Sequence, residues 1–391
     1  MENVKLGDVF SFIRNGANIK QGLDDSGYPI TRIETISERT VNRKKMGYAG
    51  ITDISKYDDY ILQDGDILMS HINSEKHLGK TAIYKKQKDE KIIHGMNLLC
   101  LRPDNSQILP EYAFYFLSSN DFLRQIPNIT KKSVNQASFT VTALKELSFA
   151  KCNIDEQKKI IDELDKVTDL IDKRKEQLSK LDELVKARFV ELFGDPLDED
   201  LANEYFTNCV EFNPKKSEIK DLQDIEVSFV PMECVGTDGS FSVKETGKVS
   251  DYYKGYTYFR DGDVLLAKIT PCFENGKVAI AENCKNGIGF GTTEFHVSRP
   301  ISGVSNSHWI KYLLKNREVH RLATINMTGS AGQKRIQTPF FDRLRIYLPP
   351  IELQNQFASF VEQTDKSKLE VQKSLEKLEL LKKALMQKYF G

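Results

Sequence analysis

The spacing of apolar residues predicts one long, uninterrupted helix between Ile154 and Gly194. This stretch contains no proline, and its first glycine is Gly194. Apolar residues recur at alternating steps of four and three, interrupted only by Arg174: Ile160, Leu164, Val167, Ile171, Leu178, Leu181 and Val185. A 3.5-residue period keeps one seam of a helix facing a partner helix. At ~1.5 Å per residue the helix would be about 60 Å long, so we expect it to pack against a partner of similar length.

The end of the chain supplies that partner. Residues 351–391 follow the same plan with a less regular seam and stop at Gly391. We therefore predict an α+β chain in which two similar α/β recognition domains are separated by two long antiparallel helices, an intramolecular coiled coil with pseudo-two-fold symmetry. The predicted boundaries are 1–150 for the first domain, 151–195 for the first spacer helix, 199–346 for the second domain and 347–391 for the second spacer helix.

Short β-like runs between Gly, Asp, Asn and Pro residues predict the first domain to be a mixed globule. We expect strands in residues 28–36, 64–72, 80–84, 96–103 and 144–150, one helix over Pro110–Leu123, and a polar loop at 131–138. A turn is expected at Asp64-Gly65-Asp66. The acidic stretch DPLDED that follows Gly194 is interpreted as a linker.

The second globule repeats the first in one register. Residues 65–83 (GDILMSHINSEKHLGKTAI) align without gaps on 262–280 (GDVLLAKITPCFENGKVAI), 197 positions later. The same offset relates three further pairs: Arg102-Pro103 and Arg299-Pro300, Ser133/Gln136 and Ser330/Gln333, and Phe193-Gly194 and Phe390-Gly391. Chance similarity would not hold one register across four separated blocks. Upstream of residue 65 the similarity fades, so the copies share a scaffold without sharing all surface residues.

Composition narrows the class of protein. The chain has 391 residues, and its 56 Lys plus Arg balance its 56 Asp plus Glu. That argues against an indiscriminate polyanion binder but not against a locally basic face. No signal sequence and no run of ~18 apolar residues is evident, so we expect a cytoplasmic protein without membrane contact. The six cysteines form no C-x-x-C pair, which indicates reduced thiols and no zinc site.

Two similar but non-identical modules on a rigid spacer suit an asymmetric bipartite target. Duplex DNA repeats its major groove every ~34 Å, so modules at a fixed separation can read two short segments around an unread gap. A coiled-coil scaffold whose modules bind proteins is the alternative. Steep loss of duplex binding with salt would distinguish the first from the second.

The order of these features resembles the specificity subunit of type I restriction-modification enzymes over the whole chain. The resemblance is carried by the duplication, by the glutamine near each helix start (IDEQ at 154–157, PIELQ at 350–354) and by the helix endings LFG and YFG. It implies two target-recognition domains that bind double-stranded DNA, with no catalysis, metal or cofactor in this chain. It also implies partners: two modification subunits that methylate adenine with S-adenosylmethionine, and restriction subunits that use ATP and Mg²⁺.

DNA contact requires Lys or Arg at phosphates, and Arg, Lys, Asn, Gln or Ser at base edges. In the first module the candidates are the loop residues, the residues around Asn73 and a basic run: Lys131, Lys132, Ser133, Asn135, Gln136, His71, Asn73, Lys76, Lys80, Arg43, Lys44 and Lys45. In the second module the candidates come from register and a further lysine pair: Lys268, Thr270, Lys277, Ser330, Gln333, Lys334, Arg335, Lys215 and Lys216. For the modification subunit we expect contacts at the helix ends, at Leu184, Phe189, Phe193, Leu381, Leu385 and Phe390, although these residues could equally pack the two helices together.

Several of these residues also have a structural interpretation. Gly79-Lys80 and Gly276-Lys277 share a repeat position and could form a common hairpin turn. Arg102 and Arg299, each before a proline at a strand end, are interpreted as structural. Gln136 and Gln333 are shared by both modules, which favours scaffold or phosphate contact over base choice.

Enzyme motifs are missing from the sequence. It contains no methyltransferase N-P-P-Y motif, no phosphate-binding P-loop and no H-E-x-x-H. The glycine-rich GIGFG at 287–291 is interpreted as a turn before a strand at 294–299, because no long helix follows it. A stand-alone nuclease built on Asp64, Asp66 and Glu75 would require metal-dependent cleavage by the isolated chain, and the turn interpretation is preferred.

Overall fold

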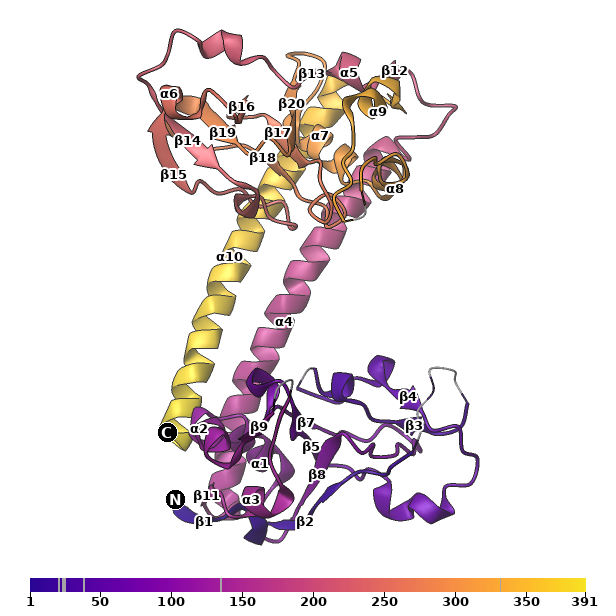
Figure 1. The fold of residues 1–391 in the computed structure, drawn as a ribbon, viewed down its shortest axis with the longest axis vertical. Coiled ribbons are helices and arrows are strands. Elements are labelled where there is room, and N and C mark those ends of the chain that lie inside the picture. The colour runs from indigo at the N-terminus through magenta and orange to yellow at the C-terminus, as the bar shows by residue number, and fades with distance from the viewer. Residues whose placement is uncertain (20–21, 23–25, 38, 134–135, 331) are drawn as a thin grey trace. The chain divides into compact units, whose positions relative to one another are not determined.

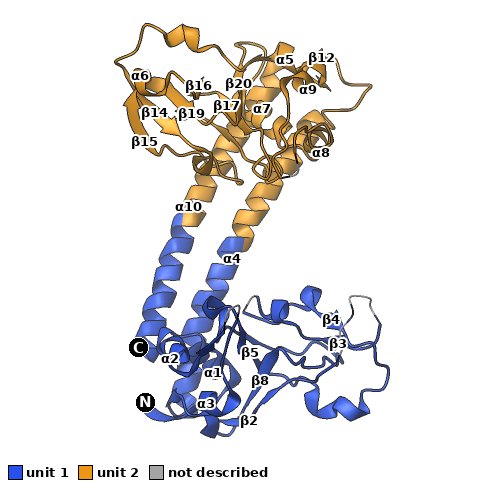
Figure 2. Cartoon of the chain, viewed as in Figure 1, with its two compact units in different colours: residues 1–175, 373–391 blue, residues 176–372 orange. Residues whose placement is uncertain are grey.

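The computed structural model describes residues 1–19, 22, 26–37, 39–133, 136–330 and 332–391. Internal contacts divide the chain into two compact units (Figure 2). Unit 1 comprises residues 1–175 and 373–391, and unit 2 comprises residues 176–372. Each unit therefore contains one globule and a part of both long helices. No helix in the described ranges is long and apolar enough to span a bilayer.

Unit 1 is built on a four-stranded antiparallel sheet of order β2-β8-β5-β7. The strands of unit 1 are β1 (Glu2–Lys5), β2 (Phe10–Asn15), β3 (Pro29–Ile30), β4 (Gly47–Tyr48), β5 (Ile67–Ser70), β6 (Ile72–Asn73), β7 (Thr81–Ile83), β8 (Leu98–Pro103), β9 (Lys131–Lys132), β10 (Ala137–Ser138) and β11 (Ser148–Lys151). Its helices are α1 (Pro110–Leu117), α2 (Asn120–Ile129), α3 (Val141–Lys145) and the first part of α4 (Ile154–Phe193). Residues of the sheet, of α1 to α3 and of α4 share one apolar core, and Figure 1 shows α1 between the sheet and α4.

Unit 2 repeats this sheet as β13-β20-β17-β18 and adds a second four-stranded sheet, β15-β14-β19-β16. Its strands are β12 (Glu204–Tyr205), β13 (Val210–Phe212), β14 (Glu226–Val230), β15 (Glu245–Lys248), β16 (Thr257–Arg260), β17 (Val264–Ala267), β18 (Val278–Ile280), β19 (Ile288–Gly291), β20 (Phe295–Pro300) and β21 (Arg345–Ile346). Its helices are α5 (Phe206–Cys209), α6 (Val249–Tyr252), α7 (Ser307–Leu314), α8 (Arg317–Ile325), α9 (Thr338–Arg343) and part of α10 (Ile351–Phe390).

The repeat seen in the sequence is also a repeat of structure. β5 begins at residue 67 and β17 at residue 264; α1 begins at 110 and α7 at 307; α4 begins at 154 and α10 at 351. Every pair has the same offset as the sequence alignment. The mixed α and β fold class, with two similar units and two 40-residue helices, is confirmed.

A buried glutamine anchors the start of each long helix. Gln157 accepts the N–H of Leu109 at 2.8 Å and donates to the carbonyl oxygens of Gln107 and Cys152. Gln354, its equivalent in the repeat, makes the same three bonds with Asn306, Val304 and Pro349. Both side chains are fully buried, and the hydrogen bonds of each amide are satisfied by groups inside the protein. The glutamine that contributed to the family resemblance therefore joins each helix to its globule.

The apolar seam buries against a different part of the partner helix in each unit. In unit 1, Ile160 and Leu164 of α4 share a core with Leu385 and Phe390 at the end of α10. In unit 2, Val185 and Phe189 near the end of α4 share a core with Phe357 and Val361 at the start of α10. Within each unit the helices thus run antiparallel, as predicted. The predicted stop is also confirmed: Gly194 follows α4 with a φ of 65°, a left-handed conformation that ends helices and suits glycine.

Several local predictions are wrong. The single helix over 110–123 is two helices, α1 and α2, broken at Ser118 and Ser119, whose hydroxyl caps α2 by accepting the N–H of Phe122. Within 28–36 only Pro29–Ile30 (β3) forms a strand, and Ile33–Ile36 forms a 3₁₀ helix. In 144–150 the chain finishes α3 before β11 begins. The polar loop at 131–138 contains β9 and β10 at its ends.

The glycine-rich 287–291 segment forms strand β19, in the middle of a sheet, and the predicted turn there is also wrong. β19 pairs parallel with β14 and antiparallel with β16. A Cβ on Gly289 would lie 2.1 Å from the ring of Phe259. Glycine is required there because an aromatic ring covers the backbone, which is a packing reason that sequence punctuation does not reveal.

Candidate nucleic-acid interface

The loop predicted to contact DNA in the first module is the tip of a small hairpin. β10 pairs with β9 on one side and with β6 on the other, so that Ala137 lies between Lys132 and Asn73. The tip is closed by Ser133, whose N–H and hydroxyl both donate to the carbonyl of Gln136 at 2.8 Å. Lys131, Lys132, Ser133 and Gln136 are exposed. Asn135 lies outside the described residues.

The second module carries the same hairpin at the equivalent place in the repeat. Arg335 bridges to Thr328 on one side and to Ile269 on the other, the positions equivalent to those bridged by Ser138. The N–H of Ile336 donates to the carbonyl of Lys268 at 2.9 Å, as Phe139 donates to His71 in unit 1 at 3.1 Å. Ser330, Gln333 and Lys334 are exposed. The structure thus brings His71 and Asn73 beside the described hairpin residues of unit 1, and Lys268 and Thr270 beside those of unit 2.

The supporting segment of unit 1 contributes polar groups of different kinds. His71 is 6% exposed, its ring packs edge-on against Phe139, and burial lowers its pKa to about 4. It is therefore neutral at physiological pH and supplies no charge for a phosphate. Asn73 accepts the N–H of Ser74 at 2.7 Å and lines a small cavity of about 140 Å³ together with Lys80.

The glycine-lysine pairs form turns in both units. Gly79 has a φ of 74° and Gly276 a φ of 71°, which confirms the shared turn. After these turns the lysines differ. Lys80 is exposed, as is Lys76, whereas Lys277 donates to the carbonyl of Met232 at 2.9 Å.

The basic run at 43–45 forms a 3₁₀ helix at the surface. The Nε and Nη2 atoms of Arg43 each donate to a carboxylate oxygen of Glu90, and Nη2 also donates to the carbonyl of Lys85 at 2.7 Å. Arg43 is therefore held inside unit 1. Lys44 is exposed, and the exposed Lys45 donates to the hydroxyl of Ser37.

In the lysine pair at 215–216 of unit 2, one side chain is likewise exposed and the other is held by the protein. Lys215 is exposed, while Lys216 donates to the carbonyl of Tyr253 at 3.0 Å and lies near that tyrosine ring. Lys268 and Thr270 are half-buried beneath the hairpin. The hydroxyl of Thr270 accepts the N–H of Lys334 at 3.0 Å.

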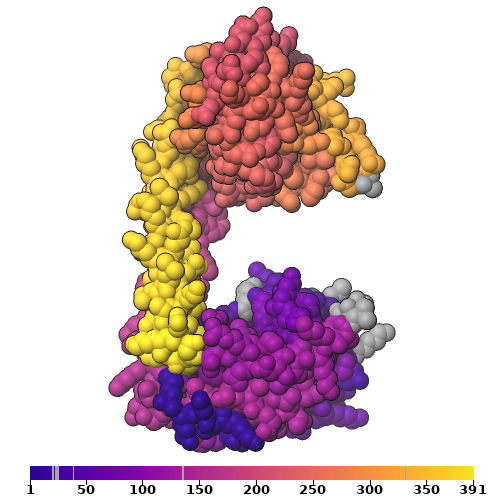
Figure 3. Space-filling model, turned by 60° about the vertical axis from the view of Figure 1, so that its left-hand side comes forward, coloured from indigo at the N-terminus to yellow at the C-terminus, as the bar shows by residue number. Residues whose placement is uncertain are grey.

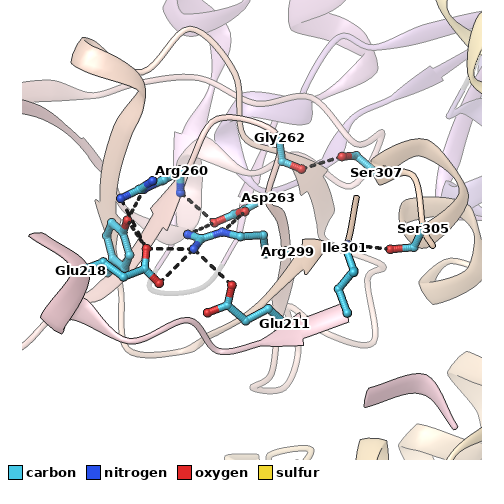
Figure 4. A network of polar contacts seen from close by, with 10 residues as sticks. Glu211, Glu218, Arg260, Gly262, Asp263, Arg299, Ile301, Ser305 and Ser307 are labelled. Carbon is cyan, nitrogen blue, oxygen red and sulfur yellow. Dashed lines mark hydrogen bonds and ion pairs between the residues drawn. The ribbon is translucent and has the colours of Figure 1, made fainter. Parts of the chain in front are cut away.

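Arg102 and Arg299 are structural, as predicted. Arg102 binds both oxygens of Asp66 at 2.7 Å, and Asp66 also accepts the N–H of Gln63. In unit 2, Arg299 binds both oxygens of Asp263, at 2.9 and 3.0 Å. Figure 4 shows Arg299 pointing also at Glu211 and Glu218. Asp66 ends the predicted turn at Asp64-Gly65-Asp66, where Gly65 has a φ of 87°. Each pair therefore joins the turn before one strand (β5 or β17) to the neighbouring strand (β8 or β20).

The residues predicted to contact a partner subunit fall into two groups. Phe189, Phe193 and Phe390 are buried in the chain's own cores, where Phe390 packs on Tyr112 and Phe116. Leu385 is partly buried against the same core. Leu184 and Leu381, which are equivalent in the repeat, are 49% and 47% exposed. The neighbouring Leu380 is 67% exposed, and Figure 3 shows side chains of α10 (yellow) lying open on the surface.

Two acids beside the hairpins were not among the predicted site residues. Glu75 forms an ion pair with Lys132 at 2.8 Å, and Glu294 forms a bidentate pair with Arg335. The sequence signal for them is weak, because Glu75 and Glu294 do not occupy equivalent positions in the repeat. Among the described residues, no group of three or more His, Cys, Asp or Glu is placed to hold a metal ion.

The comparisons with known proteins agree with this architecture. The sequence model of a family described as "Type I restriction modification DNA specificity domain" matches residues 1–182 and 208–380. A putative type I restriction enzyme specificity subunit (MjaX) of Methanocaldococcus jannaschii is 30% identical over 98% of this chain and 91% of its own length. The EcoAI specificity subunit of Escherichia coli is 46% identical over 38% of this chain, a match that spans 25% of the E. coli protein.

Solved structures show the same fold. A type I restriction-modification S subunit from M. genitalium matches all of this chain and 96% of its own with a TM-score of 0.57, at 15% sequence identity. Since the family model covers most of the chain, and a relative of 30% identity spans nearly all of it, the chain belongs to the family of type I restriction-modification specificity subunits, which are non-catalytic.

Proposed function

We propose that this chain selects the DNA sequence for a type I restriction-modification complex, and that each unit reads one half of an asymmetric bipartite site. The observation that carries the proposal is the exposed polar hairpin, built on the same support in both units but bearing different side chains. A shared support gives each unit the same approach to a duplex. Different side chains give it a different half-site.

The exposed cations of the hairpins would contact the phosphates, and this fixes the register of the protein on the duplex. In unit 1 these are Lys131 and Lys132, with Lys44, Lys45, Lys76 and Lys80 as further exposed cations. In unit 2 Lys334 and Lys215 take this part. Base edges would be read by short polar groups next to these cations, Asn73, Ser133 and Gln136 in unit 1 and Thr270, Ser330 and Gln333 in unit 2.

The methylation and cleavage would be performed by partner subunits that bind the long helices. The exposed leucines 184 and 381 occupy equivalent positions of the two helices, which suits two copies of one modification subunit. S-adenosylmethionine would bind to that subunit, and ATP and Mg²⁺ to the restriction subunit.

Exchange of one recognition domain tests the assignment of half-sites. Residues 199–346 are replaced by the corresponding domain of another specificity subunit, and the DNA of cells carrying the complete system is profiled for methylated adenines. We expect one half of the methylated bipartite sequence to change and the other half to stay. A change in both halves would contradict the division of labour between the units.

Footprinting tests DNA recognition itself. The wild-type chain with its modification partner should protect two short segments of a duplex, and the affinity should fall steeply with salt because phosphate contacts release counterions. Protection of no duplex sequence would reject the proposal and favour a scaffold whose units bind proteins.

A further inference from the structure

The two hairpins carry their cations on different strands of the same scaffold. In unit 1 the cations Lys131 and Lys132 form the outer strand β9, and Ser138 lies on the central strand. In unit 2 the position equivalent to Ser138 is Arg335, and the adjacent residue is Lys334. The second hairpin thus has two neighbouring cations on its central strand, and the structure treats them differently.

Arg335 is fully engaged within unit 2. Its Nε lies 3.0 and 3.1 Å from the two carboxylate oxygens of Glu294, and its Nη2 lies 2.8 Å from one of them. Its remaining nitrogen, Nη1, donates to the carbonyl of Gln333 at 3.1 Å. All three nitrogens of the guanidinium therefore have acceptors inside the protein. The bidentate geometry is the strongest arrangement that an arginine forms with a carboxylate.

Lys334 has its backbone fixed and its side chain exposed. Its N–H donates to the hydroxyl of Thr270 at 3.0 Å, and its carbonyl accepts the N–H of Thr270 at 2.9 Å. Because successive side chains of an extended strand point to opposite faces, the side chain of Lys334 leaves the face on which Arg335 meets Glu294. The backbone bonds to Thr270 thus direct Lys334 away from the clamp, and the clamp keeps Arg335 on the opposite face.

Unit 1 shows what the hairpin looks like without such a clamp. Lys132 pairs with Glu75 at 2.8 Å, but the two side chains are 69% and 57% exposed. In the pair of unit 2 the corresponding values are 35% for Arg335 and 24% for Glu294. Solvent screens the exposed pair strongly, so Lys132 can exchange Glu75 for a phosphate at little cost. The more shielded bidentate pair would lose more by such an exchange.

We propose that Glu294 is a positioning residue for the second half-site: it holds Arg335, so that Lys334 contacts the DNA phosphates and Arg335 does not. This inference rests on the proposed function. It assigns neighbouring cations of one strand to different tasks, which their residue types alone do not distinguish.

Salt dependence separates the two tasks. Binding of the full chain with its modification partner is measured over a range of salt concentrations on its cognate duplex, as defined by methylation profiling. Log K falls as log salt rises, and loss of one phosphate contact reduces the magnitude of this slope by about 0.9. We expect this reduction for Lys334→Gln, and we expect Arg335→Gln to leave the slope unchanged.

Glu294→Gln should increase the magnitude of the slope by up to about 0.9, because it frees Arg335 to reach a phosphate. The double variant E294Q/R335Q should return the slope to the wild-type value.

Discrimination between bases gives the second readout. The same complexes are measured on duplexes with base changes in one half-site at a time. Glu294→Gln and Arg335→Gln should each reduce discrimination at the second half-site by up to about tenfold, because the clamped Arg335 also holds the carbonyl of Gln333, one of the residues proposed to read base edges. Discrimination at the first half-site should stay unchanged, which also shows that the variants are folded. Arg335→Lys should restore part of the discrimination because it keeps the charge next to Glu294.

Glu75→Gln in unit 1 is the matched control, and it should leave discrimination at the first half-site unchanged. The inference is wrong if Arg335→Gln lowers the salt slope as Lys334→Gln does, or if Lys334→Gln leaves it unchanged. It is also wrong if Glu75→Gln costs as much discrimination as Glu294→Gln. Failure of the wild-type complex to bind a bipartite duplex at all would instead reject the proposed function.

Discussion

The two units share one four-stranded sheet and differ mainly in the segments between β2 and β5 and between β13 and β17. The shared part contains the strands β5, β7 and β8, the helices that follow them and the hairpin, and all of these recur in unit 2 at the common offset of the repeat. Between β2 and β5, unit 1 forms a small sheet of β3 and β4 with several 3₁₀ helices. Between β13 and β17, unit 2 forms β14, β15 and β16, which pair with the later strand β19 in a second four-stranded sheet. The elements that support the hairpin and the long helices are thus the ones that repeat. A recognition domain can change half its architecture while its hairpin keeps the same support.

The largest expected difference between the units concerns the buried aspartate of each sheet. Asp66 and Asp263 are equivalent, and each is 1% exposed and clamped by an arginine. Asp66→Ala removes the carboxylate that Arg102 binds, and removal of one partner from a buried pair costs about 3–5 kcal/mol. Asp263→Ala should cost less, about 1–3 kcal/mol, because Glu211 and Glu218 still neutralise Arg299.

Hydrogen exchange measured separately in each unit tests this difference, since the two units need not unfold together. Amides of β5 and β8 should lose more protection in the Asp66→Ala variant than those of β17 and β20 lose in Asp263→Ala. Equal losses would mean that the extra acids around Arg299 do not compensate. The triple variant D263A/E211Q/E218Q should then show no additional loss.

The fold was predictable wherever periodicity or repetition carries the information. The helices were evident because one seam had to stay apolar along their whole length, and the second unit was evident because one offset related separated blocks. The details that failed have two kinds of cause. Ser119 breaks the predicted helix by capping α2 through the N–H of Phe122, which is a local signal that the prediction of a single helix did not use. Gly289 lies in a strand because Phe259 covers its backbone, and this tertiary contact leaves no local pattern.

The equivalence of the two sets of candidate residues was predictable, whereas the state of each side chain was not. Register related the candidates of the second module to those of the first, and the structure gives both sets the same hairpin support. Arg43 and Arg335 nevertheless look like free cations in the sequence, whereas Glu90 and Glu294 hold them in the fold. Those acids lie 47 and 41 residues away along the chain. Only the tertiary fold brings them next to their arginines.

Buried histidines give both units an acid sensitivity of the same sign. Burial lowers the pKa of His71 and His94 in unit 1, and of His296 in unit 2, to about 4. An unfolded histidine has a pKa near 6.5, so between pH ~6.5 and ~4 the unfolded chain binds protons that the folded chain does not. Folding stability is therefore complete above this window and falls as the pH decreases through it.

We expect His94→Gln to remove about 1–2 kcal/mol of the destabilisation of unit 1 between pH 7 and pH 5. His94 is suited to this test because it is 1% exposed and its Nε2 bonds the carbonyl of Leu98 at 2.9 Å, a bond that a glutamine amide can replace. The measurement is the pH dependence of hydrogen exchange in each unit. Unit 2 serves as the internal control, and an unchanged pH dependence in unit 1 would show that His94 is not the titrating group.

The smallest expected effects concern the ion pairs between the long helices. In unit 2, Lys368 of α10 pairs with Asp182 of α4 at 2.7 Å and also with Asp365. In unit 1, Lys175 of α4 lies 3.6 Å from Glu379 of α10, and both side chains are more than half exposed. Surface pairs contribute about 0–1 kcal/mol. Asp182→Asn should cost more than Glu379→Gln, because Lys368 is only 21% exposed, and 0.5 M salt should reduce both costs. Thermal unfolding at two salt concentrations measures these costs. A loss of several kcal/mol from either variant would mean that ion pairs, more than the apolar seam, hold the helices together.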